Sequence, residues 1–325
     1  MLYDLIILGG GPAGAASAVY AARKRLKTLL ITESFGGQSV VSDDIQNWIG
    51  ETHISGFDLA KKFEDHVRSF GDAVEIKMPE RVVKISKYRN IDMSTFKVET
   101  DQGEYESKAV ILAIGARRRK LNVPGEQKFE GKGVVYCSTC DAPLFEGKTV
   151  AVIGGGNAGL EAVVDLFAYA PKIYLLIRGD SMKGDPATQE EITKNPKVEI
   201  IFNAETKEVL GDKPARSAGG FVESLKYQDL KTGELKEIKV QGVFVEIGST
   251  PNSEIVKDLV ELDQWGQVKI DSKHASTSVP GIFAAGDITD DPYKQNNISA
   301  GDAVKAALAA YAYLQKRQKQ PPGAA

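Results

Sequence analysis

The two cysteines of this chain stand three positions apart, at Cys137 and Cys140, and a carboxylate, Asp141, follows the second one. A closely spaced thiol pair can be a structural disulfide, part of a zinc site or a redox dithiol. A zinc site needs about four ligands, and the three histidines are too widely spaced to supply a second ligand pair. We therefore predict no metal and favour a redox dithiol, which exchanges electrons with another disulfide through a mixed disulfide. An inert pair is the alternative.

A dinucleotide-binding pattern opens the chain. An apolar run over residues 2–8 predicts a buried parallel strand, and the glycine-rich stretch 9–14, spaced G-x-G-x-x-G, follows it directly. An alanine-rich helix to about Lys24 and a second strand over 27–32 come next, and Glu33 then stands where a ribose hydroxyl would be held. Glycines let the backbone approach a pyrophosphate at the helix N-terminus. This order of elements predicts a dinucleotide site.

The same pattern recurs after the dithiol. The expected strand covers residues 149–153, the glycine loop 154–159, the helix 160–169 and the next strand 172–177. A degenerate copy that binds nothing is the alternative, and the intact glycines argue against it. Two dinucleotide folds with a dithiol between their loops suggest a flavin and a nicotinamide that feed electrons to a disulfide. The predicted fold class is α/β, with two Rossmann-like, three-layer domains.

Other segments carry structural patterns. Residues 56–70 have apolar side chains at helical spacing, Phe57 among them, and predict a core-facing helix. Residues 221–247 alternate around a Lys-Thr-Gly-Glu turn and predict an antiparallel meander. A final helix is expected over 301–315, and the polar tail after it is expected to be disordered. Asp287 follows an apolar run and a glycine, where it could meet a ribityl chain; a turn aspartate is the alternative.

Composition and charge limit the class of protein. Of the 325 residues, 42% are apolar and 26% charged, as in a globular protein of two ordinary domains. The net charge of −3 favours neither nucleic acid nor an anionic membrane as a partner. No apolar run approaches the roughly 18 residues of a spanning helix, and no basic segment precedes the first apolar run. We therefore expect a first strand instead of a signal peptide, and a cytoplasmic location.

Taken together, the motifs resemble a known family, the low-molecular-weight thioredoxin reductases. The stretches that match its order and spacing are GGGPAG (9–14), GGQ (36–38), NWIG (47–50), AIGA (113–116), CSTCD (137–141), GGGNAG (154–159), AAGD (284–287) and YKQ (293–295). The resemblance runs from Leu2 to about Gln315. The stretches RRRKLNVPGE, CDAPLFEGK and MKGD are closer still to the reductase core of the alkyl hydroperoxide reductase flavoprotein. That relative carries an extra N-terminal disulfide module, whereas this chain begins at the FAD loop, so we expect its electrons to pass to a separate protein.

The resemblance implies a discontinuous FAD-binding domain, residues 1–116 and 247–325, with an NAD(P)H-binding domain, 117–246, inserted between its parts and carrying the dithiol. It also implies joints near Gly115 and Gly248, a rotation of the inserted domain between electron transfers, and a homodimer. Carried over position by position, the residues that would hold FAD are Gly9, Gly11, Pro12, Ala13, Gly14, Glu33, Gly37, Gln38, Asn47, Asp287 and Gln295. Those for the nicotinamide nucleotide are Gly154, Gly156, Asn157, Ala158 and Arg178.

The resemblance also implies roles within the dithiol segment. Cys140 would lie nearest the flavin, and Cys137 would attack the partner disulfide. Asp141 would exchange a proton with the flavin-side thiolate; a helix N-cap is its alternative role. Ser138 and Thr139 are expected to tune the relay without direct chemistry.

The choice of nucleotide depends on the residues that end the strand 172–177. Thioredoxin reductases that use NADPH carry a His-Arg-Arg run there, and the peroxide-reductase relative, which prefers NADH, carries a glutamate at the first of these positions. This sequence has Ile177, Arg178 and Gly179 instead. The loss of the basic cluster tilts the expectation slightly towards NADH.

The predicted function is that of a thioredoxin-disulfide reductase. Electrons would pass from NAD(P)H through FAD and the Cys137/Cys140 dithiol to thioredoxin, or to a thioredoxin- or glutaredoxin-like protein. Three alternatives stay open: a flavin reductase of thioredoxin driven by ferredoxin or another donor, a dithiol oxidase that passes electrons to oxygen, and a non-enzymatic, flavin-bearing redox sensor.

Overall fold

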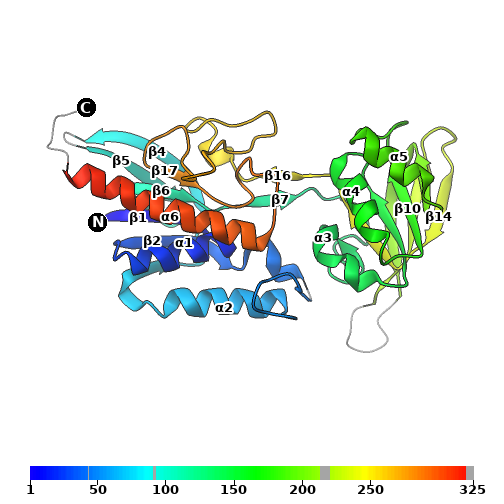
Figure 1. Cartoon of the computed structure of the whole chain (residues 1–325), viewed down its shortest axis with the longest axis horizontal. Helices are drawn as coiled ribbons and strands as arrows, with labels where there is room; N and C mark the ends of the chain where they lie inside the picture. The colour runs from blue at the N-terminus through cyan, green and yellow to red at the C-terminus, as the bar shows by residue number, and fades with distance from the viewer. Residues whose placement is uncertain (43, 91–92, 213–219, 320–325) are drawn as a thin grey trace. The chain divides into compact units, whose positions relative to one another are not determined.

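The computed structural model describes four stretches of the chain, residues 1–42, 44–90, 93–212 and 220–319. The chain divides into two compact units: unit 1 comprises residues 1–117 and 250–325, and unit 2 comprises residues 118–249. The polypeptide passes between them through β7 (Ala116–Arg118) and β16 (Ser249–Pro251), which pair with each other (Figure 1).

A sheet with a parallel centre forms the base of unit 1. β1 (Leu2–Gly10) lies between β2 (Thr28–Phe35) and β6 (Glu104–Leu112) and is parallel to both. The other described strands of this sheet are β3 (Val74–Lys77), β4 (Val82–Asn90), β5 (Met93–Thr100) and β17 (Ile282–Ala284). β3 and β17 continue the parallel pairing, whereas β4 and β5 are antiparallel. β1 is a continuous apolar run because both faces of the sheet are covered.

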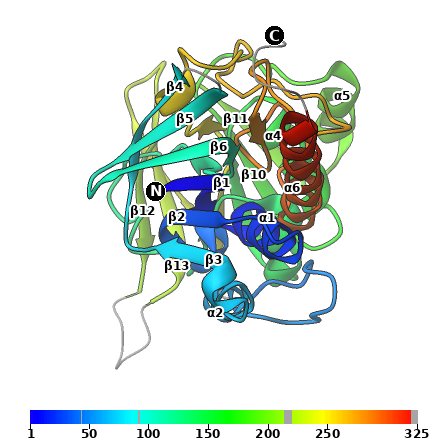
Figure 2. The same cartoon turned by 90° about the vertical axis from the view of Figure 1, so that its left-hand side faces the viewer.

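Two alanine-rich helices, α1 (Pro12–Arg23) and α6 (Asn296–Lys319), lie side by side over unit 1's sheet (Figures 1 and 2). The buried alanines in this layer are Ala15, Ala18, Ala21 and Ala22 of α1 and Ala303, Ala306, Ala307 and Ala310 of α6. Small side chains on adjoining turns let helix axes approach closely.

Helix α6 begins at Asn296, so the last helix starts before the predicted residue 301. It also includes residues 315–319 of the tail that was expected to be disordered; residues 320–325 lie outside the described residues.

Helix α2 (Gly56–Arg68) also belongs to unit 1 and corresponds to the helix predicted over residues 56–70. It buries Leu59, Ala60 and Val67, as its apolar spacing indicates. The prediction that Phe57 faces the core is wrong, because its side chain is 69% exposed. Phe57 lies in the first turn, to one side of the stripe that the three buried residues define.

Unit 2 combines a parallel sheet, in the order β11-β10-β9-β15-β8, with a smaller antiparallel sheet, β12-β13-β14. The strands are β8 (Val134–Val135), β9 (Thr149–Ile153), β10 (Lys172–Ile177), β11 (Val198–Phe202), β12 (Ala204–Gly211), β13 (Val222–Asp229), β14 (Leu235–Lys239) and β15 (Gly242–Val245). Its helices are α3 (Ser138–Asp141), α4 (Asn157–Leu166) and α5 (Pro186–Lys194). From β9 the chain builds outward to β10 and β11, while β15 lies on β9's other side. The carboxyl ends of β9 and β15 therefore form a switch point, where open α/β sheets bind ligands.

The predicted meander over residues 221–247 is correct for β13 and β14 and wrong for β15. β15 pairs with β9 and β8, parallel to both, in the larger sheet of unit 2. All four of its residues are buried, which is typical of an interior parallel strand. Its short apolar run therefore continues the Rossmann-like sheet instead of the hairpin before it.

The predicted α/β class with two Rossmann-like units is confirmed. The strands expected over residues 149–153 and 172–177 have these bounds in the structure. Four short 3-10 helices complete the described elements: η1 (Gly37–Val41), η2 (Gly71–Ala73), η3 (Ala142–Phe145) and η4 (Glu254–Val256). Among the described helices, none combines the length and the apolar character that crossing a membrane requires.

Candidate active site

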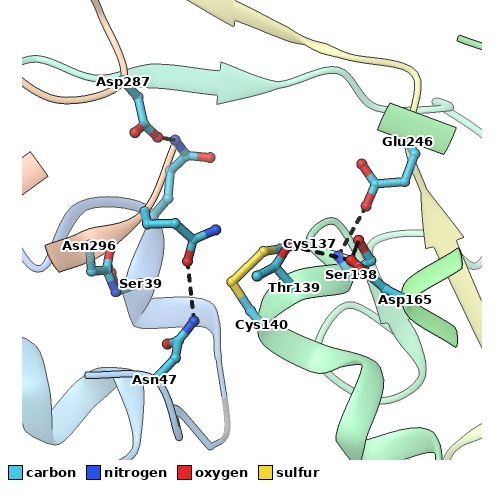
Figure 3. The surroundings of a disulfide bond; sticks show 12 residues. Ser39, Asn47, Cys137, Ser138, Thr139, Cys140, Asp165, Glu246, Asp287 and Asn296 are labelled. Atoms are coloured by element: carbon cyan, nitrogen blue, oxygen red, sulfur yellow. Dashed lines mark hydrogen bonds between the residues drawn. A yellow bond between two sulfur atoms is a disulfide. The ribbon is translucent and has the colours of Figure 1, made fainter. Parts of the chain in front are cut away.

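The two cysteines are joined in a disulfide at the start of a one-turn helix of unit 2 (Figure 3). Cys137 occupies the N-cap position of α3 in an extended backbone conformation, and Cys140 lies within the turn. Their Cα atoms are 5.4 Å apart. Cys137 and Cys140 are both half-buried, and Thr139 between them is exposed. The disulfide is therefore not sealed in a core, as exchange with a second protein requires.

Asp141, the last residue of α3, is a buried acid with 8% of its surface exposed. Burial raises the pKa of its carboxyl to about 7, and the positive charge of Arg118 offsets part of this effect. A carboxyl with a pKa near neutrality can both hold and release a proton at neutral pH. The alternative role as a helix N-cap finds no support: Asp141 precedes η3, but its side chain makes no capping hydrogen bond.

A second buried acid, Glu246, which no motif identifies, contacts the dithiol helix. It follows β15, and its carboxylate accepts a hydrogen bond from the N–H of Ser138 at 3.3 Å (Figure 3). Burial raises the pKa of Glu246 to about 7, the positive charge of Arg118 lowers it, and the charge of Asp141 raises it further. The one sign of this residue in the sequence is a charged position inside an apolar run, VFVEI.

Ser138 connects the dithiol helix to α4. Its hydroxyl donates to Oδ2 of Asp165 at 2.8 Å, and the hydroxyl of Thr139 lies 3.5 Å from the same oxygen (Figure 3). Through its amide, Ser138 also holds Glu246. These contacts give Ser138 and Thr139 a structural part, because they fix α3 from two sides.

The second glycine loop lies at the same carboxyl edge of the sheet as the dithiol helix. A Cβ at Gly154 would lie 2.2 Å from the backbone oxygen of Glu246, so the residue that touches Ser138 also adjoins this loop. A Cβ at Gly159 would lie 2.1 Å from the oxygen of Gly154. Both glycines therefore stand where no side chain fits, and α4 begins in close contact with the end of β9.

The middle of this loop is open. Gly156, Asn157 and Ala158 are exposed, and a Cβ at Gly156 would meet no atom within 4 Å. This leaves the first N–H groups of α4 available to an anion such as a pyrophosphate. The side-chain oxygen of Asn157 accepts a hydrogen bond from the N–H of Asp185 at 2.8 Å. Arg178, one residue past β10, is exposed at the same edge.

In unit 1 the first glycine loop joins β1 to α1 in a similarly tight turn. A Cβ at Gly14 would lie 1.8 Å from the oxygen of Gly9, and a Cβ at Gly9 would lie 2.3 Å from the oxygen of Ala113. Gly11 is the N-cap of α1, and Pro12 takes the first helical position, where no N–H is needed. The loop thus presents backbone alone.

A cavity of about 720 Å³ lies against this loop within unit 1. Among the residues predicted to hold FAD, those that line it are Gly9, Gly11, Pro12, Ala13, Glu33, Gly37, Gln38 and Asp287. Gly14, Asn47 and Gln295 do not line it. Residues 80–82, which follow β3, do so although no motif identifies them.

Side chains far apart in the sequence meet beside this cavity. Nε2 of Gln38 donates to Oδ2 of Asp287 at 3.2 Å, and Nδ2 of Asn47 donates to Oε1 of Gln295 at 3.2 Å (Figure 3). The two pairs span 249 and 248 residues of sequence. They hold the segment around η1 to the segment that leads into α6.

Residues 3–311, nearly the whole chain, match the family model described as pyridine nucleotide-disulphide oxidoreductase. The chain belongs to this family. A Bacillus subtilis protein named NADH dehydrogenase is 43% identical over 313 residues, which are 96% of this chain and 58% of the relative. An alkyl hydroperoxide reductase protein of Escherichia coli is 40% identical over 314 residues, with the same two shares. The chain thus spans about 58% of the length of these curated relatives.

Solved structures give a closer match in length. The crystal structure of thioredoxin reductase from Streptococcus pyogenes superposes with a TM-score of 0.88 at 34% identity, covering 97% of this chain and 99% of that one. Thioredoxin reductase from Giardia duodenalis gives 0.87 at 30% identity, with the same coverage. The resemblance to thioredoxin reductases and to the alkyl hydroperoxide reductase flavoprotein is therefore confirmed.

Membership of this oxidoreductase family implies a flavin, FAD, and a pyridine nucleotide, and the residues present fit both. Each unit has a glycine loop whose backbone is bare because a Cβ would collide with a neighbouring carbonyl. Each loop opens a helix of at least ten residues, α1 or α4, with its first N–H groups at the loop. Within the described residues, no group of three or more His, Cys, Asp or Glu side chains is placed to hold a metal ion.

We expect the Gly14→Ala variant of this oxidoreductase to be purified without bound flavin. The added Cβ would meet a backbone oxygen at 1.8 Å, so the loop must shift, at a cost of roughly 2–3 kcal/mol of unfolding free energy. The ratio of flavin to protein absorbance after purification, with urea denaturation, measures both effects. Gly301→Ala, an exposed glycine of α6 with no atom within 4 Å of its Cβ, is the matched control. Full flavin content in Gly14→Ala would contradict the role of the loop.

The two buried acids of this oxidoreductase make its stability depend on pH. The pKa values of Asp141 and Glu246 are both raised to about 7, so the folded chain keeps protons that the unfolded chain releases. The stability that these groups contribute is full below about pH 4 and is lost as the pH rises through about 7. Relative to the double variant Asp141→Asn/Glu246→Gln, we expect the wild type to lose roughly 2 kcal/mol or more of unfolding free energy between about pH 5 and pH 8. Urea denaturation at each pH measures this, and parallel pH curves would refute it.

Proposed function

We propose that this chain is an FAD-dependent disulfide reductase, which passes electrons from NADH or NADPH through the Cys137–Cys140 disulfide to thioredoxin or a thioredoxin-like protein. One observation carries the proposal. The disulfide, a buried acid with a pKa near 7 and an open glycine loop lie at one carboxyl edge of one sheet. Reductases named for thioredoxin share the whole fold. Homodimer assembly, which comes from the family resemblance, and a cytoplasmic location, which comes from the reading of the first apolar run as a strand, are part of the proposal.

Each unit takes one cofactor in this proposal. In unit 1 the loop at Gly11 and Pro12 holds the FAD pyrophosphate, Glu33 a ribose hydroxyl and Asp287 the ribityl chain. In unit 2 the loop at Gly156 holds the pyridine nucleotide. Bound FAD supplies two-electron exchange between the nicotinamide and the dithiol.

The chain's own residues then handle electrons and protons at sulfur. Two electrons entering the Cys137–Cys140 bond break it and leave two thiolates. Asp141, protonated below about pH 7, gives its proton to the Cys140 sulfur and regains one from solvent. Cys137 remains as the thiolate, the nucleophilic form.

Exchange with the partner protein completes the cycle. The Cys137 thiolate attacks one sulfur of the partner disulfide, forms a mixed disulfide and releases the other sulfur as a thiolate. Cys140 gives up its proton and attacks Cys137, which re-forms the internal disulfide and frees the second partner thiol. In total, NAD(P)H, one proton and a disulfide become NAD(P)⁺ and a dithiol.

The test is an anaerobic titration of the FAD-loaded protein with NADH and, separately, NADPH, followed by flavin absorbance. Bleaching by either nucleotide, with reduction of added thioredoxin or of a thioredoxin-like protein in a coupled thiol assay, supports the proposal. Bleaching by dithionite alone would refute the nicotinamide step and point to ferredoxin or another donor. Hydrogen peroxide release from a small dithiol, without a response to nicotinamides, would instead identify a dithiol oxidase.

A further inference from the structure

A carboxylate from a different strand stands beside the end of β10, where no acid follows the strand directly and Asp180 comes only three residues later. Oε1 of Glu205, on β12, lies 3.0 Å from Nη2 of Arg178. Glu205 also pairs with Lys207 on the same strand. The three side chains form a surface cluster, the Arg178–Glu205–Lys207 cluster, in which the glutamate is the most covered, at 27% exposure against 78% for Arg178.

Backbone contacts explain why Glu205 reaches this place. β10 and β11 are parallel, and Ile177 is in register with Phe202 at their ends. The N–H of Asn203 donates to the oxygen of Gly179 at 2.8 Å, and this hydrogen bond links the segment after β11 to the segment after β10. Glu205 comes three residues after β11, so its side chain stands at the carboxyl edge of the same sheet.

The end of β10 is also where a dinucleotide fold meets the adenosine ribose. The glycine loop is close to this point, because a Cβ at Gly155 would lie 2.8 Å from Cγ2 of Ile177. The N–H of Lys183 donates to the oxygen of Gly155 at 2.7 Å, so the segment after β10 folds back onto the loop. A nucleotide on this loop therefore brings its ribose to Arg178 and its neighbour Glu205.

We propose that Glu205 is the specificity-determining carboxylate of unit 2, which accepts a free ribose 2′-hydroxyl and disfavours a 2′-phosphate. This inference rests on the proposed function, in which unit 2 binds a pyridine nucleotide. It assigns to β12 the acid that the β10 end lacks.

Charge and hydrogen bonding give the reason. An ionised carboxylate accepts a hydrogen bond from a hydroxyl but repels a phosphate, which carries up to two negative charges. Lys207, and then Arg178, hold the pKa of Glu205 below its usual range, so it stays ionised at neutral pH. Arg178 could bind a 2′-phosphate only by sharing its charge between that group and Glu205. The exposed Arg178–Glu205 ion pair contributes little energy in itself. The repulsion between the Glu205 carboxylate and a 2′-phosphate therefore decides the preference between the two nucleotides.

The test measures nucleotide binding without any redox reaction. FAD-loaded wild type, Glu205→Gln and Glu208→Gln are titrated calorimetrically with 5′-ADP and with 2′,5′-ADP, the adenosine ends of NADH and NADPH. Bound FAD blocks the site of unit 1. Glu208 is the matched control, since it lies on the same strand and pairs with Lys226 at 3.0 Å. Thermal unfolding checks that both variants are folded.

We expect the wild type to bind 5′-ADP the more tightly, and Glu205→Gln to move the ratio of the two affinities at least about tenfold towards 2′,5′-ADP. Glu208→Gln should leave this ratio unchanged, and Arg178→Ala in the Glu205→Gln background should remove the gain. An unchanged ratio in Glu205→Gln, an equal shift in Glu208→Gln, or a wild type that prefers 2′,5′-ADP would each overturn the assignment of Glu205. If neither probe binds any variant and neither nicotinamide bleaches the flavin, the proposed function itself fails.

Discussion

We expect Cys140→Ser to leave the flavin reducible by nicotinamide and to lower the rate of partner reduction by about a thousandfold or more. The serine hydroxyl cannot form the internal disulfide, so electrons reach the flavin and stop there. The disulfide joins the two cysteines of the chain, and no other residue can replace a thiol in it. Flavin absorbance under anaerobic conditions measures the first half of the reaction, and a coupled thiol assay measures the second.

Two further variants make this experiment specific. Cys137→Ser should also abolish partner reduction, because it removes the attacking thiol. Thr139→Ser is the matched control: it lies between the cysteines, is exposed, and keeps its hydroxyl near Asp165. We expect its rate within about twofold of the wild type, as for most exposed conservative changes. Partner reduction that survives in Cys140→Ser would show that electrons bypass the disulfide.

Asp141→Asn is expected to slow reduction of the disulfide by roughly 10²- to 10⁴-fold, the usual contribution of a placed general acid. Asparagine has nearly the same shape but cannot donate the proton that the Cys140 sulfur needs. The wild-type rate should fall as the pH rises through about 7, where Asp141 loses its proton. The rate of the variant should not show this decrease. Anaerobic stopped-flow reduction from about pH 5 to about pH 9 records both profiles.

Glu246→Gln tests whether the pH dependence comes from Asp141 itself or from the second buried acid beside it. This variant removes a carboxyl that is as buried as Asp141 but hydrogen-bonds to the Ser138 amide. The charges of the two acids repel each other, and this coupling is mutual, so without Glu246 the decrease in rate should move to lower pH and persist. If Glu246→Gln loses the decrease in rate above about pH 7 and Asp141→Asn keeps it, the roles of the two acids are exchanged.

The local elements around the glycine loops were predictable from the sequence, because glycines mark where strands end and helices begin. The strands at 149–153 and 172–177 show this best. β15 was mispredicted because four consecutive buried residues carry no alternation to distinguish a hairpin strand from an interior parallel one. Phe57 was mispredicted because helical spacing does not show where the covering layer ends.

The candidate site was predictable only where its residues belong to contiguous motifs. CSTCD and both glycine loops are such motifs, and each stands at the end of a strand or the start of a helix. Glu246 directly follows β15, and Glu205 comes three residues after β11. Only the pairing of β15 with β9 and of β11 with β10 brings these two acids to the site. A single sequence does not reveal such register. Glu80, on the cavity wall of unit 1, is a third case.

The order in which a ribosome makes this chain differs from the order in which its parts can be completed. Unit 1 needs α1, near the start, and α6, near the end, to close the alanine layer between them. Unit 2 is contained in residues 118–249, so all of it has been synthesised before the second segment of unit 1 exists. At about 5–20 residues per second, the 76 residues from 250 to 325 take several seconds to add. During that interval the nascent chain carries a foldable inserted unit and an unfinished outer one, whose apolar β1 and β6 stay uncovered by α6.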